Sequence, residues 1–311
     1  MNVLITGHSG FLGDHTAKYF IDKGHKVFGL SRSIRQNCEY QQYACDILDK
    51  NKVSQIVSEK FIRLIIHIAG KPIVADCDKD PFNAFMTNGL GTASILEAAK
   101  FAGCEKTVVV ETDKVYGFQE EVPTKETAIL NPNSPYEFSK VLATQFCDFY
   151  RKQYLMDIVS VRPVNIFGAG DFSYSRVIPK AMKCIWEGTG IPVHEEGDNI
   201  FRDFIYVKDV VSAIMLLLEK EDLEGVPPVL NVSSNQGIDI PELLKYAEYD
   251  VPLNPGDACE AQNNVSDNIE LCKLGWSPTK TVYQFINEQR SRIRENKKRE
   301  SDKQSLESKG S

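Results

Sequence analysis

The chain has 311 residues, of which 42% are hydrophobic and 25% are charged. These proportions are typical of a globular protein and exclude a collagen-like or wholly disordered chain. The 36 Lys and Arg residues against 43 Asp and Glu residues give a formal charge of −7, so we expect neither nucleic acid nor an anionic membrane as a partner. The eight cysteines contain no C-x-x-C pair, and we therefore predict no metal site and no disulfide framework. With no secretion signal and no long apolar run, the sequence predicts a cytoplasmic protein.

Short apolar runs alternate with amphipathic stretches through the first half of the chain. The runs at residues 2–5, 27–30, 64–66, 107–110 and 158–162 are expected to be strands, with helices near 15–23, 51–59, 82–101 and 136–150. This alternation is typical of βαβ units. The sequence therefore predicts an α/β fold with a Rossmann-type, doubly wound parallel sheet over residues 1–167.

The regular alternation of strand and helix patterns ends after Gly168. Helices are expected near residues 177–188, 208–219 and 241–249, and Pro, Asn and Gly interrupt the segments between them. We predict a smaller mixed α/β lobe at 168–290 that mainly binds substrate. Residues 291–311 have alternating charges and no aromatic side chain, which predicts a fraying helix end followed by disorder.

The segment TGHSGFLG, residues 6–13, joins the first strand to the first helix. Glycines there permit a tight turn and a close backbone approach, and the start of the helix presents free N–H groups to an anion. A strand, a glycine turn and a helix in this order favour binding of a dinucleotide pyrophosphate. The predicted contacts are Gly7, Ser9, Gly10, Phe11, Leu12 and Gly13.

The end of the second strand bears on the choice of cofactor. It reads Ser31-Arg32-Ser33 and lacks the Asp or Glu that would accept a hydrogen bond from a ribose 2′-hydroxyl. Arg32 and Ser33 can instead bind a 2′-phosphate. The sequence thus favours NADP over NAD.

The spacing G-x-x-G-x-x-G resembles the opening motif of the extended short-chain dehydrogenase/reductase family. Three later segments also resemble that family: Cys45-Asp46-Ile47, His67-Ile68-Ala69-Gly70 and the stretch NGLGTASILE at 88–97. The resemblance covers residues 1 to about 290 and implies a tightly bound, recycled NAD(P). The further cofactor contacts that it implies are Asp46, Ile47, Ile68, Ala69, Gly70, Asn88, Tyr136, Lys140 and Pro163.

Tyr136 and Lys140 are four residues apart, so a helix places them on one face. An adjacent cation favours the phenolate and is expected to lower the pKa of Tyr136. Thr112 fills the position of the family's catalytic Ser or Thr. The resemblance implies that Thr112 and Tyr136 act on the sugar 4-hydroxyl and that Lys140 also holds the nicotinamide ribose.

Asp113 and Lys114 follow Thr112 and precede Val115-Tyr116-Gly117. This T-D-K version resembles the nucleotide-sugar 4,6-dehydratases, and the CDP-glucose enzymes in particular. The resemblance implies a hydro-lyase that forms a 4-keto-6-deoxy sugar by internal hydride transfer. Asp113 is then the candidate acid, and Lys114 is the candidate base or enolate stabiliser.

The expected substrate is a nucleotide-diphosphate sugar, with Lys71, Asn165, Arg176 and Arg202 as predicted contacts. Lys71 stands where CDP-glucose dehydratases usually have Gln. Asn254 occupies a position where many relatives have Arg, which puts one phosphate contact in doubt.

Three other functions remain open from the sequence. Two keep the same fold and triad: a 4-epimerase and an NADPH-dependent 4-keto-sugar reductase, the latter suggested by Arg32. The third is a cofactor-bound regulatory or scaffold protein, suggested by Asn254. By resemblance, we also expect a homodimer formed through the helices near 83–100 and 136–151.

Overall fold

The computed structural model describes residues 1–187, 201–247 and 264–309, and side chains as far as residue 296. Its centre is a seven-stranded sheet in the order β10-β6-β5-β4-β1-β2-β3, and every pairing in it is parallel. The predicted Rossmann-type α/β fold is confirmed. The strands are β1 (Asn2–Thr6), β2 (Lys26–Ser31), β3 (Gln41–Ala44), β4 (Leu64–His67), β5 (Lys106–Val110), β6 (Ile158–Pro163) and β10 (Val229–Val232).

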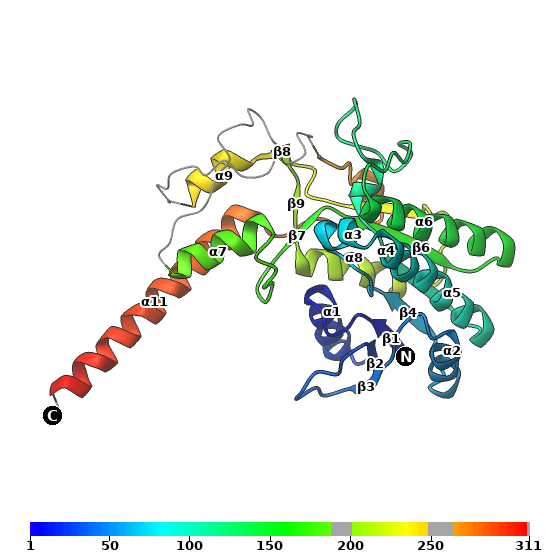
Figure 1. Cartoon of the computed structure of the whole chain (residues 1–311), viewed down its shortest axis with the longest axis horizontal. Coiled ribbons are helices and arrows are strands. Elements are labelled where there is room, and N and C mark those ends of the chain that lie inside the picture. Colours follow the sequence, from blue (N-terminus) through cyan, green and yellow to red (C-terminus); the bar gives the residue numbers. More distant parts are fainter. Residues whose placement is uncertain (188–200, 248–263, 310–311) are drawn as a thin grey trace.

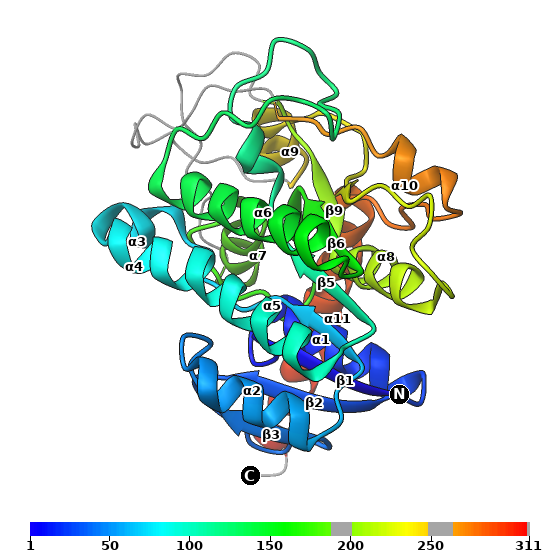
Figure 2. The same ribbon diagram turned by 90° about the vertical axis from the view of Figure 1, so that its right-hand side faces the viewer.

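Helices cover both faces of the sheet (Figure 1). Side chains alternate along each strand, so Val3 and Ile5 join one apolar cluster while Leu4 joins another. The first cluster is closed by α1 (Phe11–Asp22) and α8 (Val207–Glu219). The opposite face is covered by α2 (Lys50–Glu59), α5 (Gly91–Ala102) and α6 (Pro135–Tyr154), and α5 and α6 lie side by side (Figure 2). Burial on both faces explains why the strands read as continuous apolar runs.

The helix predicted near 82–101 is present but contains a π-helical segment. The helical conformation runs without a break from α4 (Pro81–Ala84) through the π-helical segment η1 (Phe85–Leu90) into α5, and a separate short helix, α3 (Val74–Lys79), precedes it. A π-helical turn rotates the following side chains relative to a regular helix. Here it contains Asn88, whose amide points inward and bonds the chain at Lys71.

The chain after Gly168 builds two small sheets and adds to the large one. Strand β7 (Asn165–Phe167) pairs with β9 (Phe204–Tyr206), and β8 (Phe201–Arg202) pairs with β11 (Ile238–Asp239). They pack with α7 (Val177–Glu187) and α9 (Ile240–Tyr246), while α10 (Ile269–Lys273) lies against β10. Both α8 and β10 come after residue 168, yet they belong to the helix layer and the sheet of the first half of the chain. The division into two domains at residues 167 and 168 stays a prediction.

The last helix differs from the expectation of disorder. The structure continues α11 (Val282–Lys309) as one helix that projects from the body of the molecule (Figure 1). Residues 291–309 contain no Gly or Pro and are rich in Lys, Arg, Glu and Gln, which have high helix propensity, and this explains the difference. Asn254, by contrast, lies outside the described residues.

Among the residues that the structure describes, no helix is long and apolar enough to cross a membrane.

A buried ion pair joins the middle of the sheet to α6. Arg162 of β6 donates through Nε to Glu111 Oε2 at 2.9 Å, and both side chains are almost fully buried. Thr144 of α6 donates to the same carboxylate oxygen at 2.8 Å. Arg162 also donates to the Tyr116 hydroxyl at 3.0 Å, and Tyr116 donates to Asn231 of β10 at 2.8 Å. Two strands, a helix and the segment after β5 are therefore held by one polar network.

Removing one partner of this pair is expected to destabilise the fold strongly, because the other charge is left buried and unpaired. We expect Arg162→Met to lower the free energy of unfolding by about 3–5 kcal/mol, measured by urea denaturation. The double variant Glu111→Leu/Arg162→Met should recover at least half of that loss, since no unpaired charge remains. A double variant less stable than Arg162→Met would contradict this account.

Candidate active site

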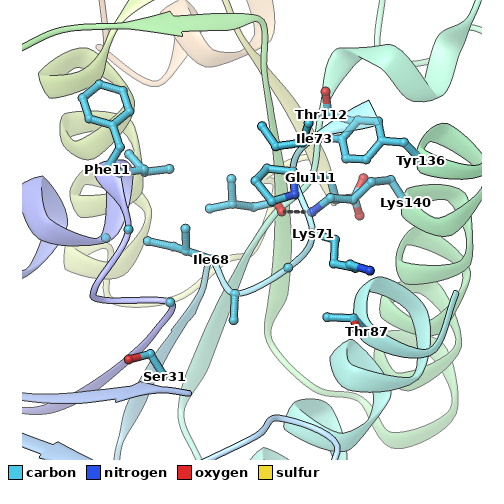
Figure 3. A pocket seen from close by; sticks show the side chains of 18 of the residues that line it. Phe11, Ser31, Ile68, Lys71, Ile73, Thr87, Glu111, Thr112, Tyr136 and Lys140 are labelled. Atoms are coloured by element: carbon cyan, nitrogen blue, oxygen red, sulfur yellow. Dashed lines mark hydrogen bonds between the residues drawn. The ribbon is translucent and has the colours of Figure 1, made fainter. Parts of the chain in front are cut away.

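A cavity of about 640 Å³ opens at the carboxyl ends of the parallel strands. It runs from the turn after β1, past the ends of β2, β4 and β5, to the start of α6. Figure 3 shows Thr112, Tyr136 and Lys140 at one end of the cavity, and Phe11 and Ser31 at the other. In doubly wound folds this edge of the sheet is where ligands bind.

The turn after β1 fits a dinucleotide pyrophosphate. Gly7 has a φ of +70° and lies so close to the chain after β4 that a Cβ would come within 2.8 Å of the Ala69 nitrogen. Gly10 caps α1 without any side-chain hydrogen bond, so the first N–H groups of α1 are not capped by a side chain. Free N–H groups and the helix dipole favour an anion at this position.

Most of the predicted cofactor contacts line this single cavity. The first group comes from the turn and the end of β2: Gly7, Ser9, Gly10, Phe11, Leu12, Gly13, Ser31, Arg32 and Ser33. The second comes from the ends of β3, β4 and β6 and from α6: Asp46, Ile47, Ile68, Ala69, Gly70, Pro163, Tyr136 and Lys140. Their assignment as cofactor contacts remains a prediction that this arrangement supports.

Asn88 is the exception among these predicted contacts. It is 1% exposed and does not line the cavity. Its Oδ1 accepts from the Lys71 backbone N–H at 2.7 Å, and its Nδ2 donates to the Lys71 carbonyl at 3.2 Å and to Ser139 Oγ at 2.8 Å. A direct contact with the cofactor stays a prediction, and in this structure backbone and hydroxyl groups already bond the amide. Asn88 instead fixes the loop that carries Lys71 into the cavity.

Thr112, Tyr136 and Lys140 meet at the end of β5, as predicted. Thr112 follows the end of β5 by two residues and caps the 3-10 turn η2 (Asp113–Tyr116), while Tyr136 and Lys140 lie one turn apart on α6. Lys140 Nζ donates to the Val110 carbonyl at 3.1 Å. All three side chains line the cavity and are less than 10% exposed.

The expected lowering of the Tyr136 pKa is not what the structure gives. Burial raises the pKa of Tyr136 above its usual range, and a hydrogen bond with Thr112 opposes this only in part. Burial also lowers the pKa of Lys140, while the nearby Glu111 carboxylate raises it. The sequence argument considered the neighbouring cation alone and omitted the cost of removing the phenolate from water.

Asp113 is a buried carboxylic acid on the cavity wall. Burial raises its pKa, and the positive charge of Lys114 and a hydrogen bond from Thr112 oppose that shift. Thr112 Oγ1 donates to Asp113 Oδ1 at 3.2 Å, and Oδ2 is buried without a hydrogen-bond partner among the described residues. A carboxyl with a raised pKa and one unused oxygen can carry a proton and donate it. Lys114, the next residue, also lines the cavity.

The predicted substrate contacts divide into two groups. Lys71, Asn165 and Arg176 line the cavity. Arg176 pairs with Asp171 at 2.6 Å, and the Asn165 amide donates to the Asp203 carbonyl at 3.0 Å. Arg202 does not line the cavity: its guanidinium donates to the Phe201 carbonyl at 3.1 Å. Its charge still acts on Asp113, where it lowers the pKa of the carboxyl.

The sequence analysis missed several residues that line the cavity. Most of them adjoin predicted residues at the carboxyl ends of strands, so applying the strand-end rule throughout would have found them. Asn83 and Thr87 had no such signal, because only the packing of α4 and η1 turns them toward the cavity. The missed residues are Cys45, Leu48, Pro72, Ile73, Asn83, Thr87, Val110, Glu111, Val164, Ile166 and Ser173.

A parallel sheet with this strand order and a glycine turn at its centre define a Rossmann-type dinucleotide-binding protein. Residues 3–233 match the model of the NAD dependent epimerase/dehydratase family. The chain belongs to this family of extended short-chain dehydrogenase/reductase enzymes, as its motifs predicted.

Characterised relatives include both reaction types of that family. A dTDP-D-glucose 4,6-dehydratase of Dictyostelium discoideum is 28% identical over 248 residues, covering 72% of this chain but only 57% of the relative. A UDP-glucose 4-epimerase of Lacticaseibacillus casei is 27% identical over 305 residues, covering 89% of this chain and 92% of the relative. The solved structure of UDP-glucose 4-epimerase from Thermotoga maritima with UDP-glucose has a TM-score of 0.86 at 26% identity, covering 95% of this chain and 99% of that one.

The buried Asp203 is expected to make stability depend on pH. Burial raises the pKa of Asp203 to about 7, although hydrogen bonds from Ser234 oppose the shift. An acid whose pKa is raised on folding stabilises the fold in its protonated form, so its contribution is full below about pH 4 and is lost as the pH rises through about 7. Between about pH 5 and about pH 8, the free energy of unfolding should fall by about 1–3 kcal/mol more in the wild type than in Asp203→Asn.

Urea denaturation at the two pH values measures this difference. Asp22→Asn changes an exposed carboxylate at the end of α1 and is the matched control, which should keep the wild-type pH dependence. Equal pH dependence in the wild type and in Asp203→Asn would show that Asp203 titrates normally.

Proposed function

We propose that the chain is a nucleotide-sugar 4,6-dehydratase, which converts an NDP-hexose to an NDP-4-keto-6-deoxyhexose and water. The observation that carries the proposal is Asp113: its raised pKa and unpartnered Oδ2 suit a proton donor, and it lies beside Thr112 and Lys114 on the cavity wall. A 4-epimerase needs no acid to expel a hydroxyl. The dehydratase relative supports the same reading.

A bound NAD(P) would supply a nicotinamide ring that takes up a hydride and returns it, and whose oxidised form carries a positive charge. The residues that would hold it are those of the glycine turn, the ends of β2, β3 and β4, and Lys140. Because the hydride is returned to the sugar, the reaction would consume no external oxidant or reductant, and the cofactor can stay bound through the cycle.

The chain's own residues would handle the protons. Thr112 and Tyr136 hold the sugar 4-hydroxyl, and the phenolate form of Tyr136 would take up the proton that this hydroxyl loses as it becomes a ketone. The ketone makes the C5 proton acidic, and Lys114 removes it or stabilises the enolate. Asp113 gives a proton to the C6 hydroxyl, which leaves as water and leaves a double bond between C5 and C6. The product would be completed when the hydride taken from C4 returns to C6 and a proton returns to C5. Burial favours the neutral phenol of Tyr136, so nearby positive charge is needed to stabilise a phenolate.

The substrate contacts would be Lys71, Asn165 and Arg176. Arg176 is held in position by Asp171, and a guanidinium matches the geometry of a diphosphate. Arg202 lies close enough to influence Asp113 electrostatically and is proposed to act on the acid rather than as a cavity-lining contact.

A 4-epimerase is the second candidate. The chain covers 92% of the L. casei epimerase and 99% of the Thermotoga structure, and Thr112, Tyr136 and Lys140 would serve either reaction. A 4-keto-sugar reductase differs by consuming one reduced cofactor per turnover. A regulatory or scaffold role predicts no turnover at all.

Mass analysis of products tests the reaction. Incubated separately with CDP-glucose, dTDP-glucose, UDP-glucose and GDP-mannose, the wild type should convert one of them to a product lighter by one water, about 18 mass units, by the internal redox cycle of a bound cofactor. Asp113→Asn should slow water loss by about 10²–10⁴-fold, the range typical of removing a general acid. Asp22→Asn should retain the wild-type rate.

Other products would decide against the dehydratase. An epimerised sugar of unchanged mass would assign the 4-epimerase. Consumption of NADPH with a 4-keto sugar would assign the reductase. Wild-type water loss in both Asp113→Asn and Lys114→Ala would show that these residues do not carry the reaction.

We further propose that the chain forms a homodimer through the face made by α4, α5 and α6. Large aromatic side chains are exposed there: Phe82 is 72% exposed and Phe101 is 76% exposed, and α6 adds Phe138 and Phe149. A two-fold interface buries the same patch on both copies, and aromatic residues are enriched in such interfaces.

The double variant Phe101→Ser/Phe149→Ser is expected to sediment as a single chain, whereas the wild type sediments at twice that mass. Phe172→Ser removes an equally exposed phenylalanine from the loop before α7 and should leave the dimer intact. A monomeric wild type would rule out the proposed dimer.

A further inference from the structure

Glu111 follows β5 directly and connects that strand to β6 and α6. It is buried, it lines the cavity, and it accepts a hydrogen bond from Arg162 of β6 at 2.9 Å. On α6, the Thr144 hydroxyl lies 2.8 Å from Glu111 Oε2 and 3.2 Å from the Lys140 carbonyl oxygen. Glu111 therefore fixes the position of α6 at the turn that follows Lys140.

The side chain of Lys140 returns to the same strand end. Its Nζ donates to the carbonyl of Val110, the residue before Glu111, at 3.1 Å, and this bond is drawn in Figure 3. Lys140 is thus held at its backbone through Thr144 and at its ammonium group through Val110. The second carboxylate oxygen of Glu111, Oε1, is buried and has no hydrogen-bond partner among the described residues. Its negative charge is therefore available to a neighbouring cation.

The charge of Lys140 depends on the groups around it. Burial lowers the pKa of its ammonium group, and the Glu111 carboxylate raises it. Other ionisable side chains lie on α6, α3 and β4 and on the cavity wall: Tyr136, Cys147, Cys77, His67, Asp113, Lys71 and Lys114. The two lysines add positive charge, and burial favours the neutral form of each of the other five. Glu111 differs from these five, because its ion pair with Arg162 favours the charged carboxylate.

We propose that Glu111 is a positioning residue that holds Lys140 in the cavity as an ammonium ion. The inference rests on the proposed function, in which Tyr136 needs nearby positive charge to take up a proton from the sugar. It deepens that function by naming the residue that maintains this charge. An ion pair inside the fold, between Glu111 and Arg162, then sets the charge state of a side chain on the cavity wall.

The titration of Lys140 tests the proposal without any sugar. Lysine is labelled with ¹³C at Cε, whose chemical shift changes as the ammonium loses its proton, and the Lys140 signal is the one that is missing in Lys140→Arg. In Glu111→Gln the midpoint should move to lower pH by about one pH unit or more, as expected for the loss of a nearby opposite charge. Arg162→Met removes the other partner of the same ion pair and should not lower the midpoint, because the carboxylate remains.

A second variant covers the case in which Glu111→Gln does not fold. Glu111→Leu/Arg162→Met leaves no unpaired buried charge and should also lower the midpoint, because Lys140 still loses the carboxylate. Glu97→Gln is the matched control. The Glu97 carboxylate also accepts from a hydroxyl of α6, that of Tyr150 at 2.8 Å, but near the far end of the helix, so its loss should leave the Lys140 midpoint unchanged.

The rate of product formation gives a second readout. Activity that requires the ammonium form is lost as the pH rises through the midpoint of Lys140, so the basic limb of the kcat profile should move to lower pH in Glu111→Gln. Above both midpoints, a change of about one pH unit lowers the ammonium fraction, and with it kcat, about tenfold. An equal loss of kcat at every pH would overturn the proposal, since it would show that Glu111 acts on the structure alone.

The titration itself has two outcomes that would overturn the proposal. One is a midpoint lowered equally in Glu111→Gln and Arg162→Met, which would assign the effect to loss of stability. The other is a midpoint that stays constant in Glu111→Gln and in the double variant. Absence of turnover with every sugar would contradict the proposed function alone, because the midpoint of Lys140 is measured on the protein without substrate.

Discussion

The ion pair between Glu111 and Arg162 is the interaction on which the rest of the site depends. A carboxylate and a guanidinium are buried together between β5, β6 and α6, and Thr144 and Tyr116 form further hydrogen bonds with them. Burying two charges is costly unless each is paired, so these elements must keep their positions relative to one another. Lys140 on α6 and Thr112 after β5 are thereby held at fixed positions on the cavity wall.

Burial also determines the chemistry that this end of the cavity can perform. Away from water the neutral forms of Tyr136, Asp113 and Lys140 are favoured, so the pKa values of the two acids rise and that of the lysine falls. The shifts of Asp113 and Lys140 are toward neutrality, which favours proton transfer at physiological pH, whereas the shift of Tyr136 is away from it. The phenol of Tyr136 shows the limit of this effect, because it needs added positive charge before it can act as a base.

Two residues of the sequence motifs hold their neighbours instead of lining the cavity. Asn88 was predicted to contact the cofactor, yet its amide is fully used in fixing the backbone of Lys71. His8 is buried inside the glycine turn, where its Nε2 lies 3.0 Å from Ser31 Oγ. In both cases the side chain of the motif residue bonds a neighbour that lines the cavity.

The sequence by itself determined the order of strands and helices, the glycine turn, and the set Thr112, Tyr136 and Lys140. These features follow from local periodicity and from motifs confined to a few residues, which chain neighbours alone can specify. Only the tertiary structure decided which side chains are desolvated, which polar atoms are already bonded, and which distant residues meet. The raised pKa of Tyr136 and the hydrogen bond between His8 and Ser31 are of this kind, because both depend on segments that approach each other only when the sheet is formed.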